Sequence, residues 1–433
     1  MMKIQGATVL VAGMAKSGLA AIQLLKKRGA ARIIATDTKP FDAETVGADE
    51  FRLQSPEAWQ GVDLIVLSPG VPLSAVPTTK TPVIGDLELA GQFLKGRTIG
   101  ITGSNGKTTT TSMIGHILRE SGIACQVGGN IGVPPAAMVE TSTDGQWNVL
   151  ELSSFQLETI HDFRAHIGVC LNITPDHLDR HGTLEAYAAS KRRLFETQTE
   201  MDYAVLNADD TICSSFMRNA RSQTAWFSLS ESVSPPGFCL DPYGALRSRT
   251  DFLIWANEIP IRGRHNIENT LAAATAAHLA GATLSQIRAA IMTFKAVEHR
   301  LEFVRDWKGI AFYNDSKATN VDAALKAIEA FDGGLWIILG GKDKDSDYTV
   351  LQEPLQRTAK GILLIGAAAA KIANQLPALS ITQAETLQIA VEIAAAKATP
   401  GDTVLLAPAC ASFDQFDNYE HRGRVFKSLV NSL

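Results

Sequence analysis

The chain has 433 residues, of which 45% are hydrophobic and 20% are charged, and its formal net charge is −5. This length is too great for one compact core, and the slightly acidic balance argues against a nucleic acid as the main partner. Five widely spaced cysteines without a CxxC pair argue against a disulfide framework or a zinc site. No apolar stretch approaches the about 18 residues that a membrane span needs. We expect a cytoplasmic, monomeric protein of two or three domains that acts on small molecules.

Short apolar runs, glycine-containing turns and helical stretches alternate in three sets along the chain, which is typical of parallel α/β units. The first two sets predict strands at residues 8–13, 32–37, 63–67, 98–102, 147–152, 167–173 and 203–206. Turns are expected at 230–251 and a helical region at 266–294, and the third set predicts strands at 310–314, 335–339, 361–365 and 403–407. We therefore predict an α/β fold of three domains, each built on a mostly parallel sheet, with the bounds 1–94, 95–298 and 299–433.

The first strand leads into a glycine motif that departs from the dinucleotide-binding pattern. Residues 13–18 have GxGxxG spacing, but Ala15 replaces the middle glycine, which normally lets a pyrophosphate approach the backbone. Asp37 lies 19 residues after Gly18, at the end of the second predicted strand, where a ribose-binding carboxylate would stand. A nicotinamide-dependent oxidoreductase is therefore an open but weakened alternative.

The most specific motif is the sequence TGSNGKTT at residues 102–109, between an apolar strand and a helical stretch. Glycines let backbone N–H groups close around phosphate oxygens, and the helix N-terminus adds partial positive charge. Lys107 can reach the β- and γ-phosphates of ATP, and the Thr108 hydroxyl is placed to hold Mg²⁺. Because Ile101 stands where the standard pattern has its first glycine, this is a shorter GxxGKT variant. The predicted ATP-binding residues are Gly103, Ser104, Asn105, Gly106, Lys107, Thr108 and Thr109.

Three further polar residues in the middle of the chain are ambiguous when taken alone. Glu151 ends an apolar run beside the phosphate loop, where a second Mg²⁺ ligand belongs, although a solvated strand-end carboxylate is an equal alternative. His177 follows the next strand and could bind a metal or a phosphate, but an ordinary loop histidine is favoured. Lys191 lies in a Lys-Arg-Arg run that is typical of an exposed cationic helix face.

The combination of these segments resembles the Mur ligases of peptidoglycan synthesis, in order and spacing, over essentially the whole chain. The segments that carry the resemblance are 103–109, 151–157, 172–181 and Ser190-Lys191. Residues 314–320, 339–344 and 408–416 look most like the branch of the family that adds D-glutamate. The resemblance implies a Rossmann-like uridine-nucleotide domain, a central P-loop ATPase domain and a C-terminal Rossmann-like domain that closes over the site.

The resemblance also implies a reaction. ATP would phosphorylate the carboxylate of UDP-N-acetylmuramoyl-L-alanine, and the amine of D-glutamate would attack the acyl phosphate, with ADP and phosphate released. Two Mg²⁺ ions would neutralise the phosphates, one held by Thr108 and Glu151 and the other by His177 with Lys191. In this family the lysine is carbamylated, which gives it metal-binding oxygens. The implied catalytic set is Lys107, Glu151, His177 and Lys191.

The remaining implied contacts divide among the three substrates. The uridine-nucleotide substrate would contact Ser17, Asp37, Thr38, Gly70, Asn130 and His177. ATP would additionally contact Asn269 at adenine, Arg300 and Lys317 near the phosphates, and Asp315 near the ribose. D-glutamate would contact Thr319, Lys344, Ser412 and Phe413, although Lys344 alone is more typical of a charged turn.

Two alternatives to the D-glutamate branch are open at the level of the sequence. A related amide ligase, such as another Mur ligase or a folylpolyglutamate synthase-like protein, would share the phosphate loop. The chain lacks the Asp-Asn-Pro-Arg signature of the diamino-acid-adding sibling. A nucleotide-sensing protein without catalytic activity would bind ATP, but it would leave His177 and Lys191 without a role.

Overall fold

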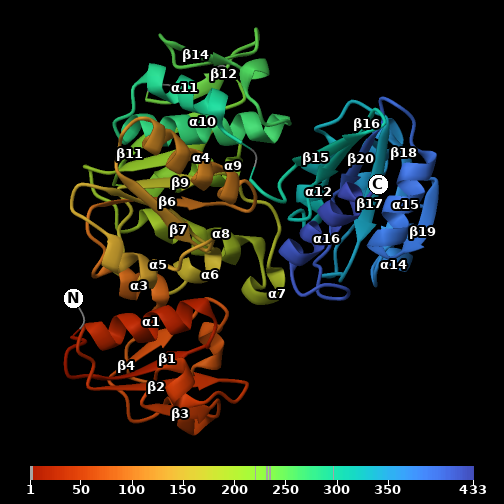
Figure 1. Cartoon of the computed structure of the whole chain (residues 1–433). Helices are drawn as coiled ribbons and strands as arrows, with labels where there is room; N and C mark the ends of the chain where they lie inside the picture. The colour runs from red at the N-terminus through yellow and green to blue at the C-terminus, as the bar shows by residue number, and fades with distance from the viewer. Residues whose placement is uncertain (1–2, 220, 231–232, 234–235, 296) are drawn as a thin grey trace. The chain divides into compact units, whose positions relative to one another are not determined.

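The computed structural model describes residues 3–219, 221–230, 233, 236–295 and 297–433. Its strands form three sheets, which follow one another along the chain (Figure 1). The chain divides into two compact units: Met1–Asn257 with Glu268–Met292, and Glu258–Ile267 with Thr293–Leu433. The first unit holds two of the sheets and the second unit holds the third.

The first sheet is fully parallel and has the strand order β3-β2-β1-β4-β5. Its strands are β1 (Thr8–Ala12), β2 (Arg32–Asp37), β3 (Glu50–Leu53), β4 (Leu64–Leu67) and β5 (Val83–Gly85), and its helices are α1 (Lys16–Lys27), α2 (Ala43–Val46) and α3 (Asp86–Gly91). The strand order reverses between β1 and β4, so the loops after these two strands diverge and leave a crevice at the carboxyl edge.

The second sheet has the order β14-β13-β12-β11-β10-β9-β6-β8-β7 and is parallel except for the hairpin pairs of its last three strands. Its strands are β6 (Arg97–Thr102), β7 (Cys125–Gly129), β8 (Trp147–Glu151), β9 (Ile167–Cys170), β10 (Tyr203–Asn207), β11 (Gln223–Ser228), β12 (Phe238–Leu240), β13 (Ala245–Arg247) and β14 (Phe252–Trp255). The helices of this region are α4 (Lys107–Glu120), α5 (Pro135–Met138), α6 (Ser154–Leu157), α7 (Leu178–His181), α8 (Leu184–Arg192), α9 (Thr211–Ser215), α10 (Arg264–Leu279) and α11 (Leu284–Thr293).

The third sheet has the order β15-β16-β20-β17-β18-β19, with β15 antiparallel to β16 and the other pairs parallel. Its strands are β15 (Glu302–Trp307), β16 (Ile310–Asn314), β17 (Leu335–Gly340), β18 (Ala359–Ile365), β19 (Ile381–Glu385) and β20 (Thr403–Leu406). Its helices are α12 (Val321–Ile328), α13 (Gln352–Thr358), α14 (Ala369–Gln375), α15 (Leu387–Lys397) and α16 (Tyr419–Asn431).

The central strands are buried and mostly apolar, because helices and loops cover both faces of a parallel sheet. In β1 the residues 9–12 are buried, and all five residues of β8 are buried, including its terminal glutamate. The predicted α/β fold with mostly parallel sheets is confirmed. The prediction of turns throughout 230–251 was wrong, because β12 and β13 lie there; each has only three residues, too few to give a periodic signal.

One carboxylate links the first two sheets within their unit. Glu88 on α3 is buried, and its oxygens accept hydrogen bonds from the backbone N–H groups of His161, Asp162 and Phe163 at 2.8, 3.0 and 2.9 Å. Three donors satisfy the buried carboxyl group, so this contact fixes the segment after α6 to the N-terminal region. None of the helices in the described part of the chain combines the length and apolar character that a bilayer crossing requires.

Candidate active site

The phosphate loop has the strand–loop–helix geometry that its sequence predicts. It connects the end of β6 at Thr102 to the start of α4 at Lys107. Gly106 has φ of +85°, and a Cβ atom there would lie 2.2 Å from Oδ1 of Asn269, so only glycine fits. The backbone of Asn172 and its side-chain Oδ1 accept hydrogen bonds from the N–H groups of Ser104 and Asn105, at 2.8 and 2.9 Å. These hydrogen bonds fix the loop to the segment that follows β9.

Two lysines converge on this loop. Nζ of Lys107 donates to the carbonyls of Gly103 and Ser104 at 2.8 and 2.7 Å, and Nζ of Lys191 donates to the same Gly103 carbonyl at 2.9 Å. Lys191 is only 1% exposed, so the expectation of an exposed cationic face was wrong. Burial and the nearby charge of Lys107 lower the pKa of Lys191 to about 7. Near pH 7, Lys191 therefore carries a neutral amine in a large fraction of the molecules.

Tyr187 on α8 joins Lys191 to the phosphate loop. Its ring centroid lies 4.5 Å from Nζ of Lys191, and its hydroxyl lies 3.1 Å from Oγ of Ser104. Oγ of Ser104 in turn donates to the Thr174 carbonyl at 2.9 Å. Because Tyr187 sits four residues before Lys191, both side chains lie on the same helix face. The sequence reasoning missed Tyr187, although its i, i+4 spacing from Lys191 was the available signal.

Glu151 ends β8, and the parallel register places it opposite Ile101 of β6 and Gly129 of β7. The residue is 2% exposed, which excludes the alternative of a solvated strand-end carboxylate. Its Oε1 accepts a hydrogen bond from Nδ2 of Asn130 at 3.1 Å, and its backbone carbonyl accepts from the N–H of Asn130 at 2.8 Å. The structure thus joins a predicted metal ligand to a predicted substrate contact.

His177 immediately precedes α7 and has a left-handed backbone conformation, with φ of 53°. Its Nε2 lies 3.7 Å from Oδ2 of Asp176, and its ring meets the Phe155 ring edge-on, with centroids 4.9 Å apart. Phe155 also stacks on His181, whose ring contacts Tyr187. His177 is therefore connected to the Lys191 helix through a chain of aromatic contacts, and its side chain is 39% exposed.

A cavity of about 700 Å³ lies at the crevice between β1 and β4. Five of the six residues predicted to contact the uridine-nucleotide substrate line this cavity: Ser17, Asp37, Thr38, Gly70 and Asn130. The sixth, His177, does not line it. Ala15, which replaces the middle glycine of the motif, lines it as well. The predicted nucleotide contacts and the predicted muramoyl contact therefore share one concave site.

Asp37 stabilises the turn that forms the cavity wall. Its Oδ2 accepts from the N–H of Met14 at 2.7 Å, and its Oδ1 accepts from the N–H of Lys39 at 3.2 Å. Burial raises the pKa of Asp37, but these backbone hydrogen bonds outweigh it and lower the pKa below its usual value. Asp37 is thus ionised at neutral pH, and part of its role is to hold the glycine turn.

The predicted ATP contacts are distributed over both units. Asn269 is buried beside the phosphate loop, with its Oδ1 3.3 Å from Oγ1 of Thr110. In the second unit, burial raises the pKa of Asp315 to about 6, against the opposing effect of the Arg300 charge. Nζ of Lys317 lies 5.3 Å from the ring centroid of Tyr419.

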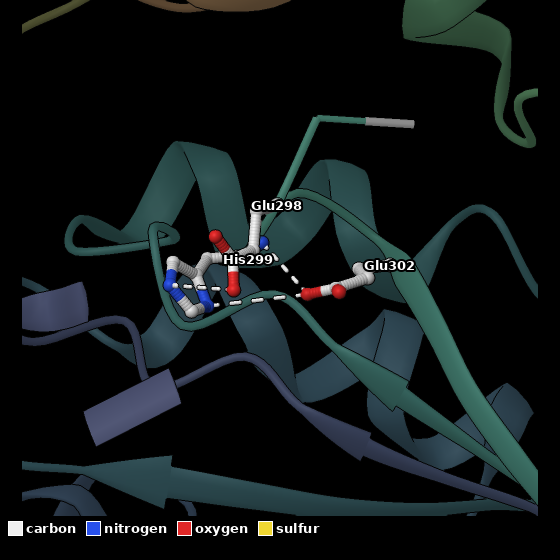
Figure 2. A group of neighbouring side chains, drawn as sticks. All are labelled: Glu298, His299 and Glu302. Atoms are coloured by element: carbon white, nitrogen blue, oxygen red, sulfur yellow. Dashed lines mark hydrogen bonds and ion pairs between the residues drawn. The ribbon is translucent and has the colours of Figure 1, made fainter. Parts of the chain in front are cut away.

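The side chains of Glu298, His299 and Glu302, which flank Arg300 in the sequence, bring together donor atoms that could hold a metal ion (Figure 2). Nζ of Lys427 lies 3.0 Å from Oε1 of Glu298 and 2.5 Å from Oε1 of Glu302, so an ammonium already neutralises both carboxylates. Burial lowers the pKa of His299. His299 and Leu301 both have positive φ, 64° and 40°, so this cluster braces a strained turn around Arg300.

The residues predicted for D-glutamate lie in the second unit. Thr319, Lys344 and Ser412 follow β16, β17 and β20, which are neighbours in the order β16-β20-β17. Because parallel strands end at the same edge, the three loops begin side by side. The loops after β17 and β20 are joined by an isolated β-bridge, in which Lys342 and Ala411 exchange backbone hydrogen bonds of 2.8 and 3.2 Å. Ser412 is buried, whereas Phe413 is 66% exposed.

The fold and the phosphate loop define a P-loop protein built on mostly parallel α/β sheets, and comparison with known proteins identifies its family. The family model of the Mur ligase middle domain matches residues 101–277, and that of the Mur ligase glutamate ligase domain matches 299–410. The chain is 59% identical to a UDP-N-acetylmuramoylalanine–D-glutamate ligase of Solibacter usitatus, over 100% of this chain and 99% of the relative. It is 50% identical to the protein of the same name from Acidobacterium capsulatum, over 99% and 97% of the two chains. The chain belongs to the Mur ligase family.

Solved structures show the same fold at low sequence identity. A pseudomurein peptide ligase type C from Methanothermus fervidus superposes with a TM-score of 0.64 and 19% identity, covering 98% of this chain and 99% of that one. The UDP-N-acetylmuramate-alanine ligase of Thermotoga maritima gives a TM-score of 0.62 and 17% identity, with coverage of 98% and 99%. Family membership overturns the oxidoreductase alternative for the N-terminal glycine motif.

Proposed function

We propose that the chain is an ATP-dependent ligase that joins D-glutamate to UDP-N-acetylmuramoyl-L-alanine through an acyl phosphate and releases ADP and phosphate. The observation that carries this proposal is the full-length identity of 40–59% to proteins named for that reaction. The arrangement around the phosphate loop supports the proposal. Lys107 and Lys191 donate to a carbonyl just after β6, and the buried Glu151 ends the neighbouring strand β8. Mur ligases in general use ATP and Mg²⁺.

The phosphate loop binds ATP in this proposal. Backbone N–H groups of residues 103–109 and the start of α4 surround the phosphates, and Lys107 neutralises the γ-phosphate as it is transferred. The transfer joins two anions, so positive charge fixed in advance lowers the barrier. Asn269 contacts adenine, and Arg300, Lys317 and Asp315 are the proposed ATP contacts of the second unit.

The donor set near the loop fits Mg²⁺, which favours hard oxygen ligands. Oxygen donors would come from the Thr108 hydroxyl, the Glu151 carboxylate and, for a second ion, a carbamate on Lys191. His177 would add one imidazole nitrogen to that second ion. Magnesium supplies charge neutralisation for the phosphates. The fit rests on Glu151, whose carboxylate is buried at the carboxyl end of β8, in register with the last residues of β6.

The environment of Lys191 suits carbamylation. The neutral amine, which a pKa of about 7 makes abundant, attacks carbon dioxide, an N–C bond forms and one proton leaves the nitrogen. The product carries two oxygens and a negative charge, and it relieves the repulsion between Lys191 and Lys107. An unmodified ammonium could not ligate Mg²⁺.

The other two substrates take the remaining sites. The uridine nucleotide occupies the cavity between β1 and β4, and Asn130 holds the muramoyl end of that substrate next to Glu151. D-glutamate, with two carboxylates, is bound by the ammonium of Lys344, by hydroxyls of Thr319 and Ser412, and by Phe413. Its amine attacks the acyl phosphate carbon, and phosphate departs as the amide forms.

We propose three domains with the bounds 1–94, 95–298 and 299–433, for the uridine nucleotide, ATP and the amino acid respectively. All of the assigned residues come from one chain, so a monomer suffices for the reaction. ATP and a uridine-nucleotide substrate are cytoplasmic metabolites, so the cytoplasm is the proposed location of the activity.

The proposal is tested by measuring phosphate release from purified protein with ATP, Mg²⁺ and UDP-N-acetylmuramoyl-L-alanine in the presence of one amino acid at a time. D-glutamate is expected to give release, whereas L-glutamate and L-lysine are not. Release with a different amino acid would assign the chain to a sibling activity. ATP binding without any substrate-dependent release would favour a nucleotide sensor.

A further inference from the structure

Arg422 is the largest side chain that is fully buried in the described part of the chain, with 0% exposure. It lies in the first turn of α16, the C-terminal helix, and no motif drew attention to it. Burying a guanidinium is costly unless every donor finds an acceptor. Its position therefore calls for an explanation from its contacts.

The guanidinium is satisfied by two loops. Its Nε donates to Oγ of Ser316 at 3.0 Å, and its Nη2 donates to the carbonyls of Ser316 and Cys410 at 2.8 and 3.2 Å. Its Nη1 donates to the carbonyls of Cys410 and Ala411 at 3.2 and 3.4 Å. Ser316 belongs to the loop after β16, whereas Cys410 and Ala411 belong to the loop after β20.

A third loop packs against the same group. A Cβ atom on Gly341 would lie 3.2 Å from Nη1 of Arg422 and 2.3 Å from the Ala411 carbonyl, so the backbone of the loop after β17 approaches closely. Ser316 lies three residues before Thr319, and Gly341 lies three residues before Lys344. Ala411 directly precedes Ser412. The guanidinium thus lies beneath all three loops that carry the proposed D-glutamate contacts.

The charge of Arg422 is not neutralised by a carboxylate within hydrogen-bonding distance among the described residues. Its acceptors are carbonyls and one hydroxyl, and Asp414 acts on it only from a distance. Burial lowers the pKa of Arg422 to about 10, so it stays protonated at neutral pH. A fixed positive charge in a low-dielectric region attracts anions at the adjacent surface.

We propose that Arg422 is a positioning residue for the incoming amino acid: it fixes the three loops after β16, β17 and β20, and its charge favours a dianionic substrate above them. This inference rests on the proposed function, because it assumes that those loops bind D-glutamate. It adds a residue outside the predicted contact set. A merely structural role would instead affect the binding of all three substrates alike.

The test compares Arg422→Lys and Arg422→Gln with Arg305→Gln. Arg305 is a matched control, because its Nη1 also donates to backbone carbonyls of α16, those of Val430 and Asn431 at 3.3 and 3.1 Å, but at the far end of the helix. Steady-state rates are measured with each substrate varied in turn. Arg422→Gln is expected to raise the KM for D-glutamate about 10-fold or more and to leave the KM for the uridine nucleotide within about 2-fold of wild type. The KM for ATP is expected to rise less than that for D-glutamate, because Asp315 and Lys317 adjoin Ser316 in only one of the three loops. Arg422→Lys keeps the charge but loses the planar set of guanidinium donors, so its KM for D-glutamate is expected to lie between those of wild type and Arg422→Gln.

Backbone amide hydrogen exchange provides a readout that does not depend on activity. Exchange at residues 314–319, 340–344 and 408–414 is expected to rise in both Arg422 variants and to stay unchanged in Arg305→Gln. If the wild type released no phosphate with D-glutamate, the proposed function would fail. The exchange data would still test whether Arg422 fixes the three loops. Equal increases in all three KM values, or unchanged exchange at the three loops in Arg422→Lys, would overturn the proposal. If Arg422→Gln does not fold, Arg422→Lys alone decides.

Discussion

The ammonium groups of Lys107 and Lys191 hydrogen-bond to one backbone carbonyl, that of Gly103, at 2.8 and 2.9 Å. The buried lysine of the pair loses hydration in its charged form, and the repulsion between the two like charges adds to that cost. Lys191 is that lysine, and it lowers the local cost by giving up its proton. The phosphate loop therefore brings the amino groups of Lys107 and Lys191 to the same backbone carbonyl.

Lys191→Ala is expected to reduce kcat by roughly 100-fold or more, since it removes the group proposed to carry a metal-binding carbamate. A small carboxylate such as acetate, added at high concentration, should restore part of the activity. Arg192→Ala is the matched control, because Arg192 is the neighbouring cation, with a side chain that is 42% exposed. Undiminished turnover in Lys191→Ala would rule out a catalytic carbamate.

The depressed pKa of Lys191 predicts a pH-dependent stability in carbon dioxide-free buffer. Below about pH 7 the lysine is protonated in both states, and the folded state bears the full cost of a buried charge. Between about pH 7 and the usual value of 10.5, the unfolded chain keeps the proton that the folded chain has lost, so the free energy of unfolding rises with pH. Urea unfolding at pH 7 and pH 9 should show wild type gaining stability relative to Lys191→Met. A constant difference between the two proteins would contradict the assignment.

Gly106→Ala is expected to abolish ATP binding and to destabilise the protein by about 2 kcal/mol or more. The new methyl group would combine a positive φ of 85° with a contact of 2.2 Å to Asn269. Gly122 has φ of 72°, and a Cβ atom there would meet nothing within 4 Å, so Gly122→Ala isolates the backbone effect, about 1 kcal/mol. Thermal unfolding with and without ATP measures both. ATP protection that survives in Gly106→Ala would show that the loop does not hold the nucleotide.

Lys344→Ala is expected to raise the KM for D-glutamate about 10-fold or more and to leave the KM for ATP nearly unchanged. The reason is that an ammonium facing a carboxylate contributes only to the amino-acid complex. Lys360→Ala serves as control, because Lys360 lies on β18 and pairs with Asp402. Equal increases in both KM values would argue against a contact between Lys344 and the amino acid.

The features that the sequence predicted are those encoded locally. A strand, a glycine loop and a helix are contiguous at residues 98–120, and Glu151 follows an apolar run whose end must lie at the sheet edge. The burial of Lys191 could not be read from its Lys-Arg-Arg surroundings, because it depends on Tyr187, Ser104 and the distant Gly103 carbonyl. Arg422 was missed for the same reason: its acceptors are mostly backbone groups, up to 106 residues away, and backbone acceptors leave no trace in side-chain patterns.

The acyl phosphate is the intermediate on which the proposed function depends, and isotope transfer tests it most directly. UDP-N-acetylmuramoyl-L-alanine with both carboxyl oxygens labelled as ¹⁸O is converted with ATP and D-glutamate, and the released phosphate is examined by mass spectrometry. Because phosphate departs with one oxygen of the original carboxylate, one ¹⁸O atom per phosphate is expected. Unlabelled phosphate accompanied by product would mean that the carboxylate is never phosphorylated, and the proposed chemistry of the site would be wrong.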